Sequence, residues 1–226
     1  LAAPLMAKDK LIGVAEVINR KDGEAFDEED LKLFSAFCRL VAMAIENARI
    51  HQLELDKQRI EQQLEAAKFI QQSFMPETFP TSPQGVFEVS AKSMAAASVG
   101  GDFFDFVEFD QRTLGVSIGD VSGKGIPAAL FMARLVSDFR LFAQIRKQPA
   151  PLLEALNKAL CDRSRRGMFV TAQYGILDAS TGKFVFANAG HLPIIRIHSK
   201  TSEIELLNQD GGIPLGISTD IHLNQG

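Results

Sequence analysis

Two aspartates, each beside glycine, have the residue type and setting that metal chemistry requires. Asp102 lies in SVGGDFFDF and Asp120 in IGDVSGKG, each at the end of an apolar, strand-like stretch. Glycine permits a tight turn there and lets the backbone approach a ligand closely. A carboxylate in this setting is a hard oxygen ligand of the kind that Mg²⁺ or Mn²⁺ requires, and the following carbonyl can supply another oxygen. Asp and Gly also dominate ordinary turns, so the spacing alone leaves both interpretations open.

The glycine-rich segment GDVSGKG does not have the spacing of a nucleotide-binding loop. Such a loop places four residues between its glycines and follows them with Lys and then Ser or Thr. Here three residues separate Gly119 from Gly123, and Gly125 follows Lys124. A solvated loop lysine is the favoured interpretation of Lys124, although its place before a helix start would also suit a phosphate contact.

Short strands and two helices must position these aspartates. Alternating and apolar patterns predict strands at residues 87–92, 113–118, 169–177, 183–189, 194–198 and 203–207. Helical patterns predict helices at about 127–146, with Pro127 in the first turn, and about 151–164. Because hairpins follow one another without crossover helices, we expect an antiparallel α+β packing of layers.

One long helical pattern precedes these strands. No Pro or Gly occurs between residues 28 and 75, Asp27 is a suitable N-cap, and Pro76 ends the pattern. Spacings of four and three in its second half define a seam made of Leu53, Lys57, Ile60, Leu64, Ala67, Gln71 and Phe74. The seam predicts a coiled coil and a parallel homodimer. Lys57 and Gln71 in it keep open a single solvated helix that lies against its own domain.

Composition and charge exclude several classes of partner. The chain has 226 residues, 46% of them hydrophobic, and a net charge of −4 without blocks of like charge, so we expect neither nucleic-acid nor anionic-membrane binding. No apolar run approaches the roughly 18 residues of a membrane span. Cys38 and Cys161 lie far apart in apolar helical patterns, which suits reduced thiols and predicts a cytoplasmic protein.

The ordered motifs from residue 66 onward resemble the PPM-type metal-dependent protein phosphatases, within them the bacterial SpoIIE-like branch. These motifs are AAKFIQQSFMPETFP, SVGGDFFDF, IGDVSGKGIPAALFMA, MFVTAQYGILD, FANAGHLP and GIPLGI. The resemblance implies a β-sandwich flanked by helices, with two Mn²⁺ or Mg²⁺ ions that activate water to hydrolyse phosphoserine or phosphothreonine. It assigns Asp102 and Asp120 as catalytic, metal-binding carboxylates and Val121 as a ligand through its backbone carbonyl.

The end of the sequence departs from that family. The family supplies two more metal-binding carboxylates from its C-terminal part, one of them in a Thr-Asp-Gly motif after the segment that GIPLGI matches. Asp220 in STDIHLNQG lies too close to GIPLGI and lacks the following glycine. Two ions would carry +4, whereas two carboxylates supply −2. We therefore expect a C-terminally truncated domain that holds metal weakly, and an active enzyme in the intact parent protein.

Five further residues have two interpretations each. Asp105 would lie either around the metal ligands or at the surface, and His191 of the NAGH motif is either a structural hydrogen-bonding residue or a general acid, the first being favoured. Arg163, Arg165 and Arg166 would either steer a phosphorylated partner or form a solvated helix end.

The N-terminal part resembles the second half of a GAF sensor domain, in the pattern LAAPLMAKDKLIGVAEVINRKDGEAFDEEDLKLFSAFCRLVAMAIENA. Similar domains bind cyclic nucleotides or other small molecules, or dimerise. Asn19, Phe26 and Asp30 keep the positions of the cyclic-nucleotide type, whereas Arg20 and Leu31 replace its Lys and Glu. The match to a nucleotide sensor is therefore partial.

These resemblances divide the chain into residues 1–50 of a GAF domain, a coiled-coil linker at 51–76 and the phosphatase domain at 77–226. They predict a sensor-regulated phosphatase whose signal passes down the long helix, with a phosphorylated STAS-type anti-sigma-factor antagonist as substrate. The alternative from another class is a non-catalytic dimeric scaffold whose phosphatase-like domain has lost its metals.

Overall fold

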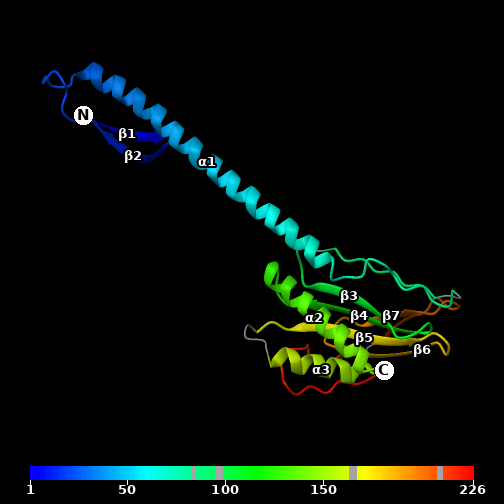
Figure 1. Ribbon diagram of the computed structural model, residues 1–226. Helices are drawn as coiled ribbons and strands as arrows, with labels where there is room; N and C mark the ends of the chain where they lie inside the picture. The colour runs from blue at the N-terminus through cyan, green and yellow to red at the C-terminus, as the bar shows by residue number, and fades with distance from the viewer. Residues whose placement is uncertain (83–84, 95–98, 163–166, 208–210) are drawn as a thin grey trace. The chain divides into compact units, whose positions relative to one another are not determined.

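The computed structural model describes residues 1–82, 85–94, 99–162, 167–207 and 211–226, in two compact units, Leu1–Gln63 and Leu64–Gly226. The described helices are α1 (Glu28–Gln72), α2 (Ile126–Ile145) and α3 (Pro149–Cys161) (Figure 1). The described strands are β1 (Ala2–Ala7), β2 (Lys10–Glu16), β3 (Asp102–Glu108), β4 (Thr113–Val121), β5 (Val170–Asp178), β6 (Lys183–Ala189), β7 (Ile194–Ile197) and β8 (Ile204–Leu207). No described helix is both long and apolar enough to cross a membrane.

The N-terminal unit combines the antiparallel β1–β2 hairpin with the first part of α1. The carboxylate of Asp27 caps the helix as expected, because its Oδ1 accepts the backbone N–H groups of Glu29 and Asp30 at 2.9 and 2.8 Å. Arg20 forms an ion pair with Asp30 at 2.6 Å, which ties the preceding loop to the first turn of the helix. Thus local interactions at the helix start fix where α1 begins.

The other end of α1 lies earlier than the sequence predicts. Helical structure stops at Gln72, and the chain tightens into turns in which Met75 N–H donates to the Gln72 carbonyl at 3.0 Å. Pro76 accounts for this, because its ring disfavours helical backbone at the preceding residue. Of the seam residues, Leu53 and Ile60 are exposed, whereas Gln71 is buried within the C-terminal unit.

The C-terminal unit is built on an antiparallel sheet in the order β3-β4-β5-β6, with α2 and α3 packed on one face (Figure 1). The predicted α+β class is confirmed. Most predicted strands form within one or two residues of their expected ends, and β4 continues three residues further, to Val121. The other sheet described in this unit is the two-stranded β7–β8 hairpin.

Two details of the strand assignment were wrong. Residues 87–92 do not form a strand, because among the described residues their only pairing is one bridge between Glu88 and Thr81. Asp102 begins strand β3 rather than following a strand, since the backbone pairing with β4 starts at this residue. The apolar side chains around it therefore belong to a strand that continues beyond Asp102, toward Glu108.

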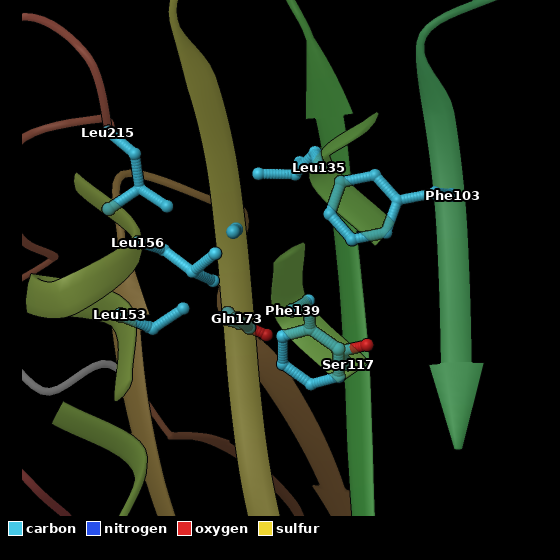
Figure 2. A pocket seen from close by; sticks show the side chains of 9 residues that line it. Phe103, Ser117, Leu135, Phe139, Leu153, Leu156, Gln173 and Leu215 are labelled. Atoms are coloured by element: carbon cyan, nitrogen blue, oxygen red, sulfur yellow. The ribbon is translucent and has the colours of Figure 1, made fainter. Parts of the chain in front are cut away.

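The hydrophobic core lies between the sheet and the two helices. Leu135 and Phe139 of α2, Leu153 and Leu156 of α3, and Phe103 of β3 converge there (Figure 2). The cavity that they line measures about 10 Å³, which is at the lower limit for one water molecule. The interior is therefore close-packed and holds no room for a ligand at this place.

Shortening a core side chain of α3 tests this packing. We expect Leu156→Ala to lower the free energy of unfolding by about 2–5 kcal/mol, because the side chain is only 2% exposed and its loss enlarges the cavity. Leu130→Ala on α2 is the matched control, since Leu130 is 67% exposed. Urea unfolding can be followed by the fluorescence of Tyr174, the single tyrosine in a chain without tryptophan, which is buried in this core. Equal losses in both variants would contradict the described packing.

Candidate metal centre

Strands β3 and β4 place Asp102 and Asp120 directly opposite each other. The antiparallel register pairs these two residues, 18 positions apart in the sequence. Their neighbours Phe103 and Val121 point into the core on the helix side, so both carboxylates project from the other face of the sheet. Side chains paired in this way have Cβ atoms about 4.5–5.5 Å apart. The structure thus brings the two predicted ligands together.

The two carboxylates disfavour each other's charge. The pKa of Asp120 is raised, first by partial burial and then by the negative charge of Asp102 and a hydrogen bond with its carboxyl group. His191 acts weakly in the opposite direction. A cation between the carboxylates would remove this repulsion, and carboxylates are the oxygen ligands that Mg²⁺ and Mn²⁺ prefer.

Gly101 brings a backbone oxygen to the same place. Val121 N–H donates a hydrogen bond to the Gly101 carbonyl at 3.2 Å. A Cβ atom at Gly101 would collide with the Val121 carbonyl oxygen and would lie 2.9 Å from Oδ1 of Asp120. Only glycine therefore lets these oxygens gather, and the three predicted ligands Asp102, Asp120 and Val121 meet around it.

This donor set fits a hard divalent ion but is small for two of them. Across the described ranges, no group of three or more His, Cys, Asp or Glu side chains is arranged to hold a metal. The candidate ligands are two carboxylates and one backbone carbonyl, so they supply a charge of −2. The residues present therefore suit one ion better than the pair that the family resemblance implies.

A threonine that the sequence did not single out lies beside the aspartates. Thr171 on β5 pairs with Asp120 across the sheet, and its Oγ1 lies 2.9 Å from Nδ1 of His191. Asn188 holds the His191 backbone from both sides, because its side chain accepts the His191 N–H at 2.8 Å and donates to the His191 carbonyl at 3.0 Å. The pairing of β4 with β5 identifies Thr171, and no local motif could have done so.

These contacts support the structural interpretation of His191. Burial lowers the pKa of its imidazole, whereas the charges of Asp120 and Asp102 raise it, with burial the larger effect. The neutral form of the ring is therefore favoured near pH 7. Its Nδ1 forms one hydrogen bond with the hydroxyl group of Thr171. Its position beside the carboxylates comes from the sheet rather than from a direct ion pair.

Asp105 lies in neither of the two places expected from the sequence. Its side chain is 2% exposed and forms a two-pronged ion pair with Arg140 of α2, at 2.7 and 3.0 Å. The reason is the alternation of side chains along a strand, because Asp105 lies three positions after Asp102 and an odd spacing puts them on opposite faces. Asp105 therefore belongs to the helix side of the sheet.

The last turn of α1 contacts the segment that carries Asp102. The Gln71 side-chain amide donates to the Gly100 carbonyl at 2.5 Å and accepts the Gly100 N–H at 3.2 Å. Gly100 precedes Asp102 by two residues. Gln71 therefore binds its own domain, which accounts for a polar residue at this seam position.

The remaining basic candidates do not join this centre in the described structure. Lys124 is exposed in the loop between β4 and α2, in keeping with a solvated lysine. Arg163, Arg165 and Arg166 lie outside the described residues. Asp220, near the C-terminal end, is exposed.

The sequence matches known proteins in both of its parts. Residues 1–47 match the GAF domain model, and residues 110–225 match the model of Stage II sporulation protein E (SpoIIE). The chain is 30% identical over 169 residues to the phosphoserine phosphatase RsbU of Bacillus subtilis, an alignment that covers 75% of this chain and 49% of RsbU. The chain thus spans about half of that relative, and 26% of the Synechocystis protein IcfG, to which it is 28% identical.

Solved structures agree with these matches. The structure of the RsbU and RsbW domains of Rv1364c from Mycobacterium tuberculosis has a TM-score of 0.51 at 26% identity, covering 59% of this chain and 37% of that one. The SiaA-PP2C domain of Pseudomonas aeruginosa has the same fold, with a TM-score of 0.63 at 19% identity over 76% of this chain and 68% of that one. Since the SpoIIE model matches more than half of the 226 residues, the chain belongs to the SpoIIE family of PP2C-type phosphatase domains and carries a GAF fragment before that domain.

Proposed function

We propose that this chain is part of a metal-dependent phosphatase that hydrolyses phosphoserine or phosphothreonine in a protein substrate. The observation that carries the proposal is the register that pairs Asp102 with Asp120 beside the Val121 carbonyl. Family membership supports it, and the RsbU relative is named a phosphoserine phosphatase. These residues provide oxygen ligands for divalent ions, which would activate water for direct attack on phosphorus.

Each residue of the centre has a part in this reaction. Asp102, Asp120 and the Val121 carbonyl would hold Mn²⁺ or Mg²⁺, and Gly101 keeps the space around these oxygens open. Bound divalent ions supply activation of water and neutralise charge on the phosphoryl oxygens. Thr171 and the neutral His191 ring border the carboxylates and orient one another through their hydrogen bond.

The substrate we propose is a phosphorylated STAS-type anti-sigma-factor antagonist, on the strength of the resemblance to the SpoIIE-like branch. The sensor part would control the reaction through α1, which continues from the N-terminal unit into the C-terminal one. The contact of Gln71 with Gly100 gives such a signal a physical route, because a shift of the last turn would pull on the backbone next to Asp102.

We also propose that α1 mediates a parallel homodimer through the N-terminal part of its seam. Leu53 and Ile60 are 60% and 57% exposed, and a second helix would cover them. Gln71, near the C-terminal end of the seam, lies outside the proposed interface because it binds its own domain.

The activity test uses the full-length parent protein, supplied with Mn²⁺ and a phosphoserine protein. We expect Asp102→Asn and Asp120→Asn each to lower kcat by at least about a hundredfold, because each removes a charged ligand of the ion that stabilises the transition state. Asp110→Asn is the matched control, since Asp110 serves the β3–β4 turn by accepting the N–H groups of Arg112 and Thr113 at 2.8 Å. If the parent has no activity and the aspartate variants behave identically, the non-catalytic scaffold is the better account.

The raised pKa of Asp120 predicts that replacing this residue stabilises the protein without metal and removes the stabilisation that Mn²⁺ provides. The folded state binds the proton of Asp120 more tightly than the unfolded state, so without metal this group's contribution falls as pH rises from the ordinary aspartate pKa through the raised one. Asp120→Asn should raise the metal-free melting temperature at pH 7 by about 1–2 °C, since it removes a like-charge contact. The same variant should lose the stabilisation that Mn²⁺ gives the unchanged chain.

Tyr174 fluorescence during heating, with and without Mn²⁺ between pH 4 and 7, measures both effects. In the unchanged chain, stabilisation by Mn²⁺ should grow as pH rises, because the ion and the proton compete for Asp120. A variant that Mn²⁺ still stabilises equally would remove Asp120 from the ligand set.

The dimer is tested by Ile60→Asp, which places a charge in the middle of the exposed seam. We expect sedimentation to give a dimer for the unchanged chain and a monomer for this variant. Gln62→Asp introduces the same charge outside the seam and should leave the dimer intact. Identical behaviour of both variants would argue against a helix-mediated dimer.

A further inference from the structure

Arg140 joins three segments of the phosphatase unit that are distant in the sequence. Its Nε and Nη2 donate to the two carboxylate oxygens of Asp105 on β3, at 2.7 and 3.0 Å. Nη2 also donates to the backbone carbonyl of Phe74, at 2.9 Å, in the turn that follows α1. A single guanidinium on α2 therefore connects the end of the long helix with strand β3.

Further contacts hold the ion pair at the centre of this connection. Asp105 is almost fully buried, and its Oδ1 also accepts the N–H of Phe106 at 3.0 Å. Ser117 of β4 donates to the Asp105 carbonyl at 3.3 Å, which ties the same residue to the neighbouring strand. The planar guanidinium fits a carboxylate in a two-pronged geometry that a lysine ammonium cannot reproduce.

Asp102 lies between two places at which the end of α1 is fastened. On one side Gln71 holds Gly100, and on the other side Arg140 links Phe74 to Asp105. The five residues from Gly101 to Asp105 include the strand start that faces Asp120. A strand held on both sides of one residue can place its carboxylate reproducibly, whereas a strand held on one side can fray from its free end.

We propose that Arg140 is a positioning residue for the metal centre, and that its link from Phe74 to Asp105 makes the geometry of Asp102 depend on the end of α1. The inference deepens the proposed function and rests on it for the identity of the metal site. Arg140 does not touch the carboxylates of the centre, because Asp105 projects from the opposite face of β3. Its effect passes through the backbone of the strand.

The test uses the whole chain with Arg140→Lys, which retains the positive charge near Asp105 but has no planar fork to hold both Asp105 and Phe74. We expect the Kd for Mn²⁺, measured by calorimetry, to rise at least about tenfold, as when residues that orient metal ligands are changed. Hydrogen exchange should become faster both at residues 69–76 and at residues 100–108. Arg134→Lys is the matched control, since Arg134 pairs with Asp138 within α2 at 3.4 Å, and it should change neither quantity.

A second variant guards against simple loss of folding. In Asp105→Leu combined with Arg140→Met, apolar side chains replace the ion pair, an exchange that proteins often tolerate, while the link to Phe74 is removed. We expect the same loss of Mn²⁺ affinity, with a Tyr174 unfolding transition that remains cooperative. Wild-type affinity in this variant, or faster exchange confined to residues 69–76 in Arg140→Lys, would overturn the proposal.

The readouts separate this inference from the proposed function. A parent protein that binds Mn²⁺ but hydrolyses no phosphoprotein would refute the phosphatase proposal, and the effect of Arg140 on Mn²⁺ affinity would still support its positioning role. If the unchanged chain binds no Mn²⁺, exchange at residues 100–108 decides. Faster exchange there supports the coupling of β3 to the end of α1, and unchanged exchange overturns it.

Discussion

The backbone pairing of β3 with β4 is the constraint on which the rest of this centre depends. It sets Asp102 opposite Asp120. It also brings Gly101, which precedes Asp102, against the carbonyl of Val121, which follows Asp120. A slip of one residue would turn one aspartate to the helix face and leave its partner alone. Packing of Phe103 on β3 and Val121 on β4 in the core opposes such a slip, because one of the two side chains would then leave the hydrophobic layer. The core therefore fixes the register, and the register makes the site.

Strand β3 places one aspartate on each face of the sheet, and the two have different surroundings. Asp102 meets another carboxylate on the open face, an arrangement that is unfavourable without a cation. Asp105 meets Arg140 on the helix face, where its charge is neutralised by a permanent partner. In the proposed centre Asp102 is therefore available to bind a metal ion, whereas Asp105 holds the strand. It also explains why α2, which contributes nothing to the donor set, can still influence it.

The connection from α1 into the phosphatase unit has a similar double character. The N-terminal part of the seam has exposed apolar residues such as Leu53 and Ile60. Near its C-terminal end the seam has the polar residue Gln71, which forms hydrogen bonds with the backbone of Gly100. One helix thus combines exposed apolar residues in one part with a contact to the segment that carries Asp102 in another.

The sequence by itself determined most of the elements and the candidate metal ligands. Proline, glycine and apolar spacing predicted α1, α2, α3 and most strands, because these signals act within a few residues along the chain. The motifs around Asp102 and Asp120 indicated the family and the residues proposed as ligands. Only the tertiary structure decided that Asp102 starts a strand, that Thr171 borders Asp120, that Asp105 pairs with Arg140 and that Gln71 holds Gly100. Each of these depends on which distant segment lies alongside, and strand register and helix packing set that choice across the whole domain.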